Sequence, residues 1–270
     1  MSRPLPVWHL TPPTASSRML VFSGNELIGE DATSAEPMFR YADLTRLGTQ
    51  PLEPILVARW NDEDVYAVAL AEPPAEFSRR GLHSVLSAGQ PDFAALASTA
   101  LQLLHWQRDN RFCGRCGAAT RLHAKERAFF CDSCQHRFFP RLSPCVIVAI
   151  RRRGQVLLAQ SHFSAGKFYS LIAGFVEPGE SAEEAVHREV LEETGLSVTN
   201  LRYVESQSWA FPHQLMLGYV VDYLDGDLVL EQEELATADW FDEQTLPTVP
   251  GRWTIAGRLI QAALSRDIPE

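Results

Sequence analysis

The sequence predicts a mixed α+β protein in three consecutive parts, and three observations support this fold class. Short apolar runs separated by polar turns fill the first third, which is typical of small β-strands. Two CxxC pairs follow at the spacing of a zinc ribbon. The last part combines further apolar runs with a helical pattern that has capping signals at both ends. The predicted parts are a small N-terminal α+β domain at 1–108, a zinc ribbon at 109–141 and a C-terminal domain at 142–270.

The composition is that of an ordinary globular protein, with 46% hydrophobic and 21% charged residues. No apolar run reaches the roughly 18 residues that span a bilayer, and the N-terminus lacks the apolar core of a signal peptide. We therefore expect no membrane partner and a cytoplasmic location.

The charge of the chain is unevenly distributed. A net charge of −10 argues against a general nucleic-acid-binding surface. However, the segment 108–153 contains eleven Lys/Arg and only three Asp/Glu. This segment is either ordinary surface charge or a region that steers a polyphosphate or an RNA 5′ end.

The first third contains no catalytic constellation. Strand patterns at Met19–Phe22, Ile55–Ala58 and Val65–Leu70 predict a small β-meander. A helical pattern follows from Pro91 to Arg108. The simplest role for this part is packing or dimerisation.

Four cysteines predict a structural zinc site. Cys113 and Cys116 form one CxxC pair, and Cys131 and Cys134 form a second pair after fourteen intervening residues. Four thiolates at this spacing suit tetrahedral Zn²⁺ and leave no ligand position open for a substrate. A redox pair or free thiols are the alternatives. Cys145 lies outside the pattern and is expected to be a buried bystander.

An aromatic run, Phe138 to Arg141, connects the ribbon to the last part. Either it packs between the parts, or Phe138 or Phe139 stacks on a nucleobase. Beyond it, Arg151 to Gly154 is expected to form a hairpin turn. Strands are predicted at Val146–Ile150, Val156–Ala159, Tyr169–Ala173, Asn200–Gln207 and Met216–Leu224, and a final helix at Thr254–Ser265.

The segment from Gly174 to Leu196 is predicted to be a loop that leads into a helix. Ser181 and Glu184 have the spacing of a capping box, and Gly195 suits the helix C-terminus. Between these signals, three glutamates at i, i+3 and i+4 fall on one helix face, where their repulsion favours a bound cation. Hard oxygen ligands suit Mg²⁺ or Mn²⁺, whereas a solvated acidic helix is the alternative. The three residues are Glu189, Glu192 and Glu193.

The full spacing of this segment resembles the signature of the Nudix hydrolases, which cleave a nucleoside diphosphate linked to another moiety. Gly174, then Glu180, then the run from Arg188 to Leu196 match the fixed positions of that signature. The resemblance implies an α/β/α sandwich around a mixed sheet for the last part.

A second array, Ser206 to Met216, resembles the one that marks the NADH pyrophosphatase branch of the family. It departs from that array at Ser208, Ala210 and Gln214. The branch implies hydrolysis of NAD(H), removal of the NAD cap from RNA 5′ ends, and a homodimer.

The resemblance also implies roles for individual residues. Arg188 would orient the carboxylates, and Glu193 or Glu189 would act as the base. The implied ligands of Mg²⁺ or Mn²⁺ are the Ala173 carbonyl, Glu189, Glu192, Glu193 and Glu234. The implied substrate-binding residues are Glu126, Phe139, Phe175, Gln207, Ser208, Trp209, Ala210, Phe211, Pro212, His213, Gln214 and Ala256.

Two other functions remain open at this point. The departures at Ser208, Ala210 and Gln214 leave room for a Nudix enzyme that acts on ADP-ribose or a diadenosine polyphosphate. A zinc-ribbon RNA-binding protein with an inactive Nudix domain is the second alternative. The intact run from Arg188 to Glu193 argues against it.

Overall fold

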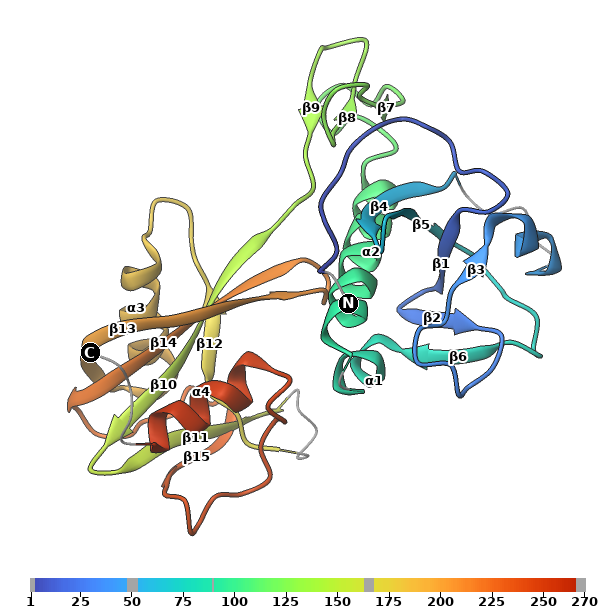
Figure 1. The fold of residues 1–270 in the computed structure, drawn as a ribbon. Helices are drawn as coiled ribbons and strands as arrows, with labels where there is room; N and C mark the ends of the chain where they lie inside the picture. Colours follow the sequence, from blue (N-terminus) through green and yellow to red (C-terminus); the bar gives the residue numbers. More distant parts are fainter. Residues whose placement is uncertain (1–2, 48–52, 89, 163–167, 266–270) are drawn as a thin grey trace. The chain divides into compact units, whose positions relative to one another are not determined.

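The computed structural model describes residues 3–47, 53–88, 90–162 and 168–265, which are arranged in two compact units (Figure 1). The first unit comprises Met1–Arg141 together with Ala210–Pro212. The second comprises Leu142–Trp209 and His213–Glu270. No helix of the described residues is long and apolar enough to cross a membrane.

The first unit is built on a mixed sheet with the strand order β4-β5-β1-β2-β6, and β3 also pairs with β1. The three predicted strands are present, but the predicted meander is wrong, because β1 and β5 run parallel with Met19 opposite Tyr66. Parallel strands need a long connection, and the chain between β1 and β5, which includes β2, β3 and β4, provides it. The strands are β1 (Arg18–Ser23), β2 (Glu26–Gly29), β3 (Phe39–Arg40), β4 (Ile55–Trp60), β5 (Glu63–Ala69) and β6 (Ser78–Gly81).

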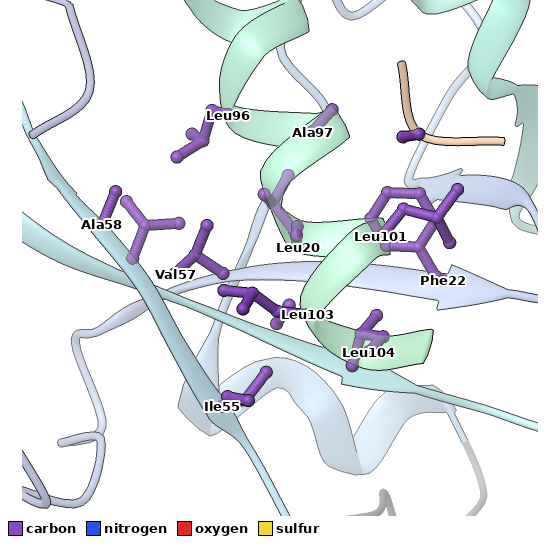
Figure 2. Close-up of a cluster of buried hydrophobic side chains, with 14 of the residues drawn as sticks. Leu20, Phe22, Ile55, Val57, Ala58, Leu96, Ala97, Leu101, Leu103 and Leu104 are labelled. Atoms are coloured by element: carbon purple, nitrogen blue, oxygen red, sulfur yellow. The ribbon is translucent and has the colours of Figure 1, made fainter. Parts of the chain in front are cut away.

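The predicted helix of the first third is α2 (Pro91–Asp109), and it supplies one side of the core of this unit. Figure 2 shows Leu96 and Leu101 of α2 in one cluster with Leu20, Phe22 and Val57 of the strands. The opposite face of the sheet, including Met19, packs in a second cluster with residues of the 3₁₀ helix η1 (Tyr41–Leu47). A short helix α1 (Leu82–Ser87) precedes α2.

The ribbon folds as a three-stranded antiparallel sheet in the order β7-β8-β9. It belongs to the first unit, where the Arg127 side chain donates hydrogen bonds to the carbonyls of Val7 and Val57 at 2.6 and 2.9 Å. The strands are β7 (Arg121–Leu122), β8 (Phe129–Phe130) and β9 (Arg137–Phe138).

The second unit has a mixed six-stranded sheet in the order β13-β14-β10-β11-β15, with β12 paired to β10. The β10–β14 pair is parallel and the other pairs are antiparallel. The strands are β10 (Ser143–Arg152), β11 (Gln155–Ser161), β12 (Ile172–Phe175), β13 (Ser197–Trp209), β14 (Gln214–Asp225) and β15 (Leu235–Phe241).

The two helices of this unit cover opposite faces of the sheet (Figure 1). Along β10, Val146 and Val148 pack in the cluster that contains residues of α3 (Ala182–Thr194). The intervening Ile147 packs in the cluster that contains residues of α4 (Ile255–Leu264). Because successive side chains of a strand point to opposite faces, this alternation confirms the predicted α/β/α sandwich.

Two local predictions need correction. The strand expected at Tyr169–Ala173 lies at Ile172–Phe175, so Gly174 is part of strand β12 rather than of the loop. The strand expected at Asn200–Gln207 extends over Ser197–Trp209 because it pairs along the length of β14. Such boundaries depend on the partner strand, and the partner is not visible in a local pattern.

Candidate active site

Local interactions fix both ends of α3. The Ser181 hydroxyl accepts a hydrogen bond from Glu184 N at 3.2 Å, and the Glu184 carboxylate accepts one from Ser181 N at 2.7 Å. This is the predicted capping box. At the other end Gly195 has φ +72° and donates its N–H to Leu191 O at 2.9 Å. Because both ends of α3 are fixed by these hydrogen bonds, the helix holds its glutamates on a rigid backbone.

Arg188 is the centre of a dense hydrogen-bond network. Its Nε and Nη2 donate to the two oxygens of Glu180 at 2.8 and 2.9 Å. Nη1 donates to Glu189 at 2.8 Å and to Glu192 at 3.0 Å. Nη2 also donates to the Phe175 carbonyl at 2.8 Å, which ties the helix to strand β12. A planar guanidinium can hold this many partners in fixed directions, so Arg188 sets the position of two of the three predicted glutamates.

Glu189 lies directly against Gly174. A Cβ built on Gly174 would lie 1.9 Å from the Glu189 Cδ, and the Glu189 side chain is only 13% exposed. The glycine is therefore needed to make room for the carboxylate, since its φ is not in the left-handed region. The neighbouring Ala173 and Phe175 are exposed beside this contact.

Glu193 is buried, with 6% of its surface exposed. Burial raises the pKa of Glu193 to about 8, and the negative charges of nearby glutamates, with Glu234 first, add to the rise. Burial also raises the pKa of Glu189, against the lowering effect of Arg188. Four carboxylates thus act on one another in a partly dehydrated region.

These oxygens fit a hard divalent cation such as Mg²⁺ or Mn²⁺, which would offset their mutual repulsion. Glu234 is exposed, and it raises the pKa of both Glu189 and Glu193 from the turn before β15. Among the described residues, the four cysteines are the only set of three or more His, Cys, Asp or Glu side chains whose ligand atoms already lie together. The carboxylates are therefore close enough to influence one another's pKa, but their oxygens are more widely spaced than those of a compact ligand set.

The four predicted zinc ligands do lie together, in the first unit. Their Sγ atoms are all within 4.8 Å of one another, and two of the separations are 3.5 Å. A tetrahedron with Zn–S bonds of about 2.3 Å needs sulfur atoms about 3.8 Å apart, so the set fits zinc. Each pair is closed by a matching turn, in which Gly117 N donates to Cys113 O and Gln135 N donates to Cys131 O. The predicted four-thiolate zinc ribbon is confirmed.

The array from Ser206 to Met216 is the end of the β13–β14 hairpin. Ser208 pairs with Leu215, and Trp209 pairs with Gln214. His213 Nδ1 lies 3.2 Å from the Ser143 hydroxyl. These residues belong to the second unit, whereas Ala210, Phe211 and Pro212 belong to the first.

In the first unit, Ala210 is buried in the core cluster that contains residues of α2. The Phe211 ring stacks on His83 with their centroids 4.0 Å apart. The structure therefore places the predicted substrate-binding array partly in each unit.

Gln207 fixes the start of α4. Its Oε1 accepts a hydrogen bond from Ile255 N at 2.6 Å, and its Nε2 donates to Trp253 O at 3.1 Å. Trp209 stacks on Trp253 with centroids 5.9 Å apart, and Ala256 is buried in the first turn of the helix. Sequence reasoning missed Trp253, which carries no motif and is identified only by this packing.

The two remaining predicted binding residues lie in the ribbon. Glu126 forms an ion pair with Arg137 at 3.1 Å and lies 3.5 Å from a ring nitrogen of His123. Phe139 is 56% exposed, so its ring is available for stacking. Both residues belong to the first unit.

Comparison with known families gives three matches that follow one another along the chain. The profile of the NADH pyrophosphatase-like rudimentary NUDIX domain matches residues 16–106. That of the NADH pyrophosphatase zinc ribbon domain matches residues 108–139. The NUDIX domain profile matches residues 140–262, which include the whole of α3.

The chain is also similar to individual proteins over most of its length. The chain is 42% identical over 205 residues to the NAD-capped RNA hydrolase NudC of Klebsiella pneumoniae, covering 76% of this chain and 78% of that one. It is 38% identical over 237 residues to the NAD-capped RNA hydrolase NudC of Vibrio cholerae, covering 88% of each chain. A crystal structure of a NUDIX hydrolase from Nitrosomonas europaea superposes with a TM-score of 0.50 at 23% identity, over 58% of this chain and 92% of that one. This last likeness concerns the fold alone.

Proposed function

Because the chain belongs to the Nudix hydrolase family, in the branch of the NAD-capped RNA hydrolases NudC, we propose that it hydrolyses the pyrophosphate of NAD(H) and of the NAD cap on RNA 5′ ends. Free NAD(H) gives NMN(H) and AMP, and the capped transcript gives NMN and 5′-monophosphate RNA. Both substrates contain the same pyrophosphate, so one site serves both.

The observation that carries the proposal is the Arg188 network. It fixes Glu189 and Glu192 on one edge of α3, next to the buried Glu193 and against the backbone of β12. In the proposed reaction Arg188 is a positioning residue, because it acts through the carboxylates that it orients. Glu189 and Glu193 are the two candidates for the group that takes the proton of the attacking water.

The proposed metal-binding groups are Glu189, Glu192, Glu193, Glu234 and the Ala173 carbonyl. Nudix enzymes use Mg²⁺ or Mn²⁺, which when bound neutralises phosphate oxygens and lowers the pKa of a bound water. Glu193 is buried in this region, and a bound divalent cation would favour the charged form of its carboxyl group over the neutral form.

The proposed recognition groups lie on several elements. Exposed rings at Phe175 and Phe139 offer faces for base stacking, and Trp209 is already stacked on Trp253. Gln207 acts in part by holding the start of α4, where Ala256 lies. The remaining proposed contacts are Glu126, Ser208, Ala210, Phe211, Pro212, His213 and Gln214.

We further assign packing or dimerisation to residues 1–108, the structural zinc to 109–141 and catalysis to 142–270. A cytoplasmic homodimer completes the proposal. Light scattering on the purified protein tests the dimer, and a molar mass near the 30.2 kDa of one chain would contradict it.

The deciding experiment is a comparison of hydrolysis rates in Mg²⁺ or Mn²⁺ for NADH, NAD⁺, ADP-ribose, a diadenosine polyphosphate and NAD-capped RNA. We expect NAD(H) and capped RNA to react and Glu189→Gln and Glu193→Gln each to lose most of the rate. Preference for ADP-ribose or the diadenosine compound would favour the alternative that the departures at Ser208, Ala210 and Gln214 leave open. Unchanged rates in both glutamine variants would indicate an inactive Nudix domain.

A further inference from the structure

Four arginines gather at the end of the sheet in the second unit. Arg151 and Arg152 end strand β10, Arg153 begins the turn to β11, and Arg202 approaches Asp222 beside them from β13. We call these four residues the arginine cluster. Arg151, Arg152 and Arg153 line an open hollow of about 920 Å³, whose other walls include Tyr223 and the end of α4.

The cluster has more positive charge than its neighbours neutralise. Arg151 donates to Asp222 at 2.7 and 3.0 Å, and Arg202 lies 3.9 Å from the same carboxylate. In the described part of the chain, Asp222 is the only carboxylate within salt-bridge distance of the four arginines. Arg152 and Arg153 therefore retain their full charge in a protein whose net charge is −10.

Arg152 is held by aromatic rings rather than by an acid. Its guanidinium lies 4.0 Å from the Trp240 ring centroid and 5.4 Å from that of Tyr223. Cation–π stacking fixes the plane of the guanidinium and leaves its N–H edge available. A fixed guanidinium edge matches the oxygens of a phosphodiester, which it can bind in a bidentate way.

Arg153 occupies a position that is unfavourable for its residue type. It has φ +50° and precedes Gly154 with φ +82°, so both central residues of the turn have positive φ. Such two-residue turns favour Asn-Gly or Asp-Gly, and arginine has no conformational advantage there. Its contribution at this exposed position is therefore its charge.

We propose that the arginine cluster binds the phosphodiester backbone of single-stranded RNA whose 5′ cap lies in the active site. The inference rests on the proposed function, because it identifies the surface that receives the rest of a capped transcript. Arg152 is half-buried against the aromatic rings and Arg153 is exposed beside it, and a positively charged groove of this kind can follow the backbone of a single strand without regard to its sequence.

The distance to the candidate active site suits this assignment. Gly174 lies opposite Val146 on β10, and Arg152 is six residues further along the same strand, on the face covered by α3. At about 3.3 Å per residue the separation is about 20 Å, which corresponds to about six stacked nucleotides at roughly 3.4 Å each. Free NAD(H) is too short to reach the cluster from the active site.

The test uses the full-length protein and variants that remove charge without breaking the turn. Arg153→Asn creates the favoured Asn-Gly turn, so its fold should be at least as stable as that of the native chain. Arg152→Gln and the double variant complete the series. Arg46→Asn is the matched control, because Arg46 is an exposed arginine of the first unit that pairs with Glu30.

Two measurements are made on each variant, the first of them at 50 mM salt. The first compares hydrolysis of NADH, of an NAD cap on two nucleotides and of an NAD cap on twelve nucleotides. We expect KM for the twelve-nucleotide substrate to rise about threefold in each single variant and roughly tenfold in the double variant. NADH and the two-nucleotide substrate should be unaffected, and Arg46→Asn should behave as the native chain.

The second measurement is binding of an uncapped 5′-monophosphate twelve-nucleotide RNA, followed by fluorescence anisotropy against salt concentration. Each lost contact should reduce the slope of log K against log salt by about 0.7. Because this assay needs no catalysis, it tests the cluster even if the proposed hydrolysis fails.

Three results would overturn the inference. The first is unchanged affinity for the uncapped RNA in the double variant, and the second is an equal loss for NADH and for the long capped RNA. The third is an acidic peptide of the same charge that binds as tightly as the RNA through the same arginines, which would make the partner a protein.

Discussion

The carboxyl group of Glu189 lies where a side chain on residue 174 would have to be, since a Cβ built on Gly174 comes within 1.9 Å of its Cδ and about 2 Å of both oxygens. Strand β12 and helix α3 can approach this closely only because residue 174 has no side chain. The contact belongs to the proposed catalytic geometry, so its disruption should appear in the rate before it appears in the fold.

Gly174→Ala is therefore expected to displace Glu189 and to reduce kcat for NADH by about 10²-fold, the scale of a misplacement of about 1 Å. Gly81→Ala is the matched control, because no atom lies within 4 Å of a Cβ built there. The assay is steady-state hydrolysis of NADH alongside thermal unfolding of each variant. An alanine at 174 with native kcat would show that the position of Glu189 does not matter to the reaction.

Arg188→Lys keeps the positive charge but loses the planar set of donors. A single ammonium cannot serve Glu180, Glu189 and the Phe175 carbonyl at once. We expect kcat to fall by about 10²-fold with KM for NADH changed much less, because a positioning residue acts on the carboxylates rather than on the substrate. If KM rises while kcat stays constant, Arg188 binds substrate instead.

The Arg188–Glu180 pair predicts a specific dependence of stability on pH. The hydrogen bonds from Arg188 lower the pKa of Glu180 to about 2, from an ordinary value of 4.5. A carboxylate with a lowered folded-state pKa stabilises the fold fully above pH 4.5, and this contribution disappears as the pH falls toward 2.

The difference in thermal stability between the native chain and Glu180→Gln should accordingly be constant above pH 4.5 and shrink between pH 4.5 and 2. Circular dichroism melts across pH 2 to 6 measure this difference directly. If the difference in melting temperature stays constant down to pH 2, the charge of the Glu180 carboxylate does not contribute to the stability of the fold.

Substitution of two different cysteines should have contrasting effects on the zinc content of the protein. Cys131 belongs to the four-sulfur set, whereas Cys145 is buried in β10 of the second unit. Cys131→Ser should lose the zinc, which elemental analysis would measure as a fall from one zinc per chain toward none, and its melting temperature should drop. Cys145→Ala should retain the zinc. Equal zinc content in both variants would contradict the four-thiolate assignment.

Much of this protein follows from local patterns. The capping box at Ser181, the end of the helix at Gly195 and the shared face of Glu189, Glu192 and Glu193 depend on residues within a few turns of one another. The zinc set depends on two tight turns with fixed spacing. Such short-range features are visible in a sequence because the physical interactions that create them are themselves short-range.

Other features depend on contacts between distant parts of the chain, and only the tertiary structure decided them. These include the parallel pairing of β1 with β5 and the packing of Ala210 in the core of the first unit. They also include the hydrogen bond that the Gln207 side chain accepts from Ile255 N at the start of α4. These two residues lie 48 positions apart in the sequence. A pattern specifies which face of an element is apolar, but many partners satisfy that face equally well, and the partner is chosen by the packing of the whole unit.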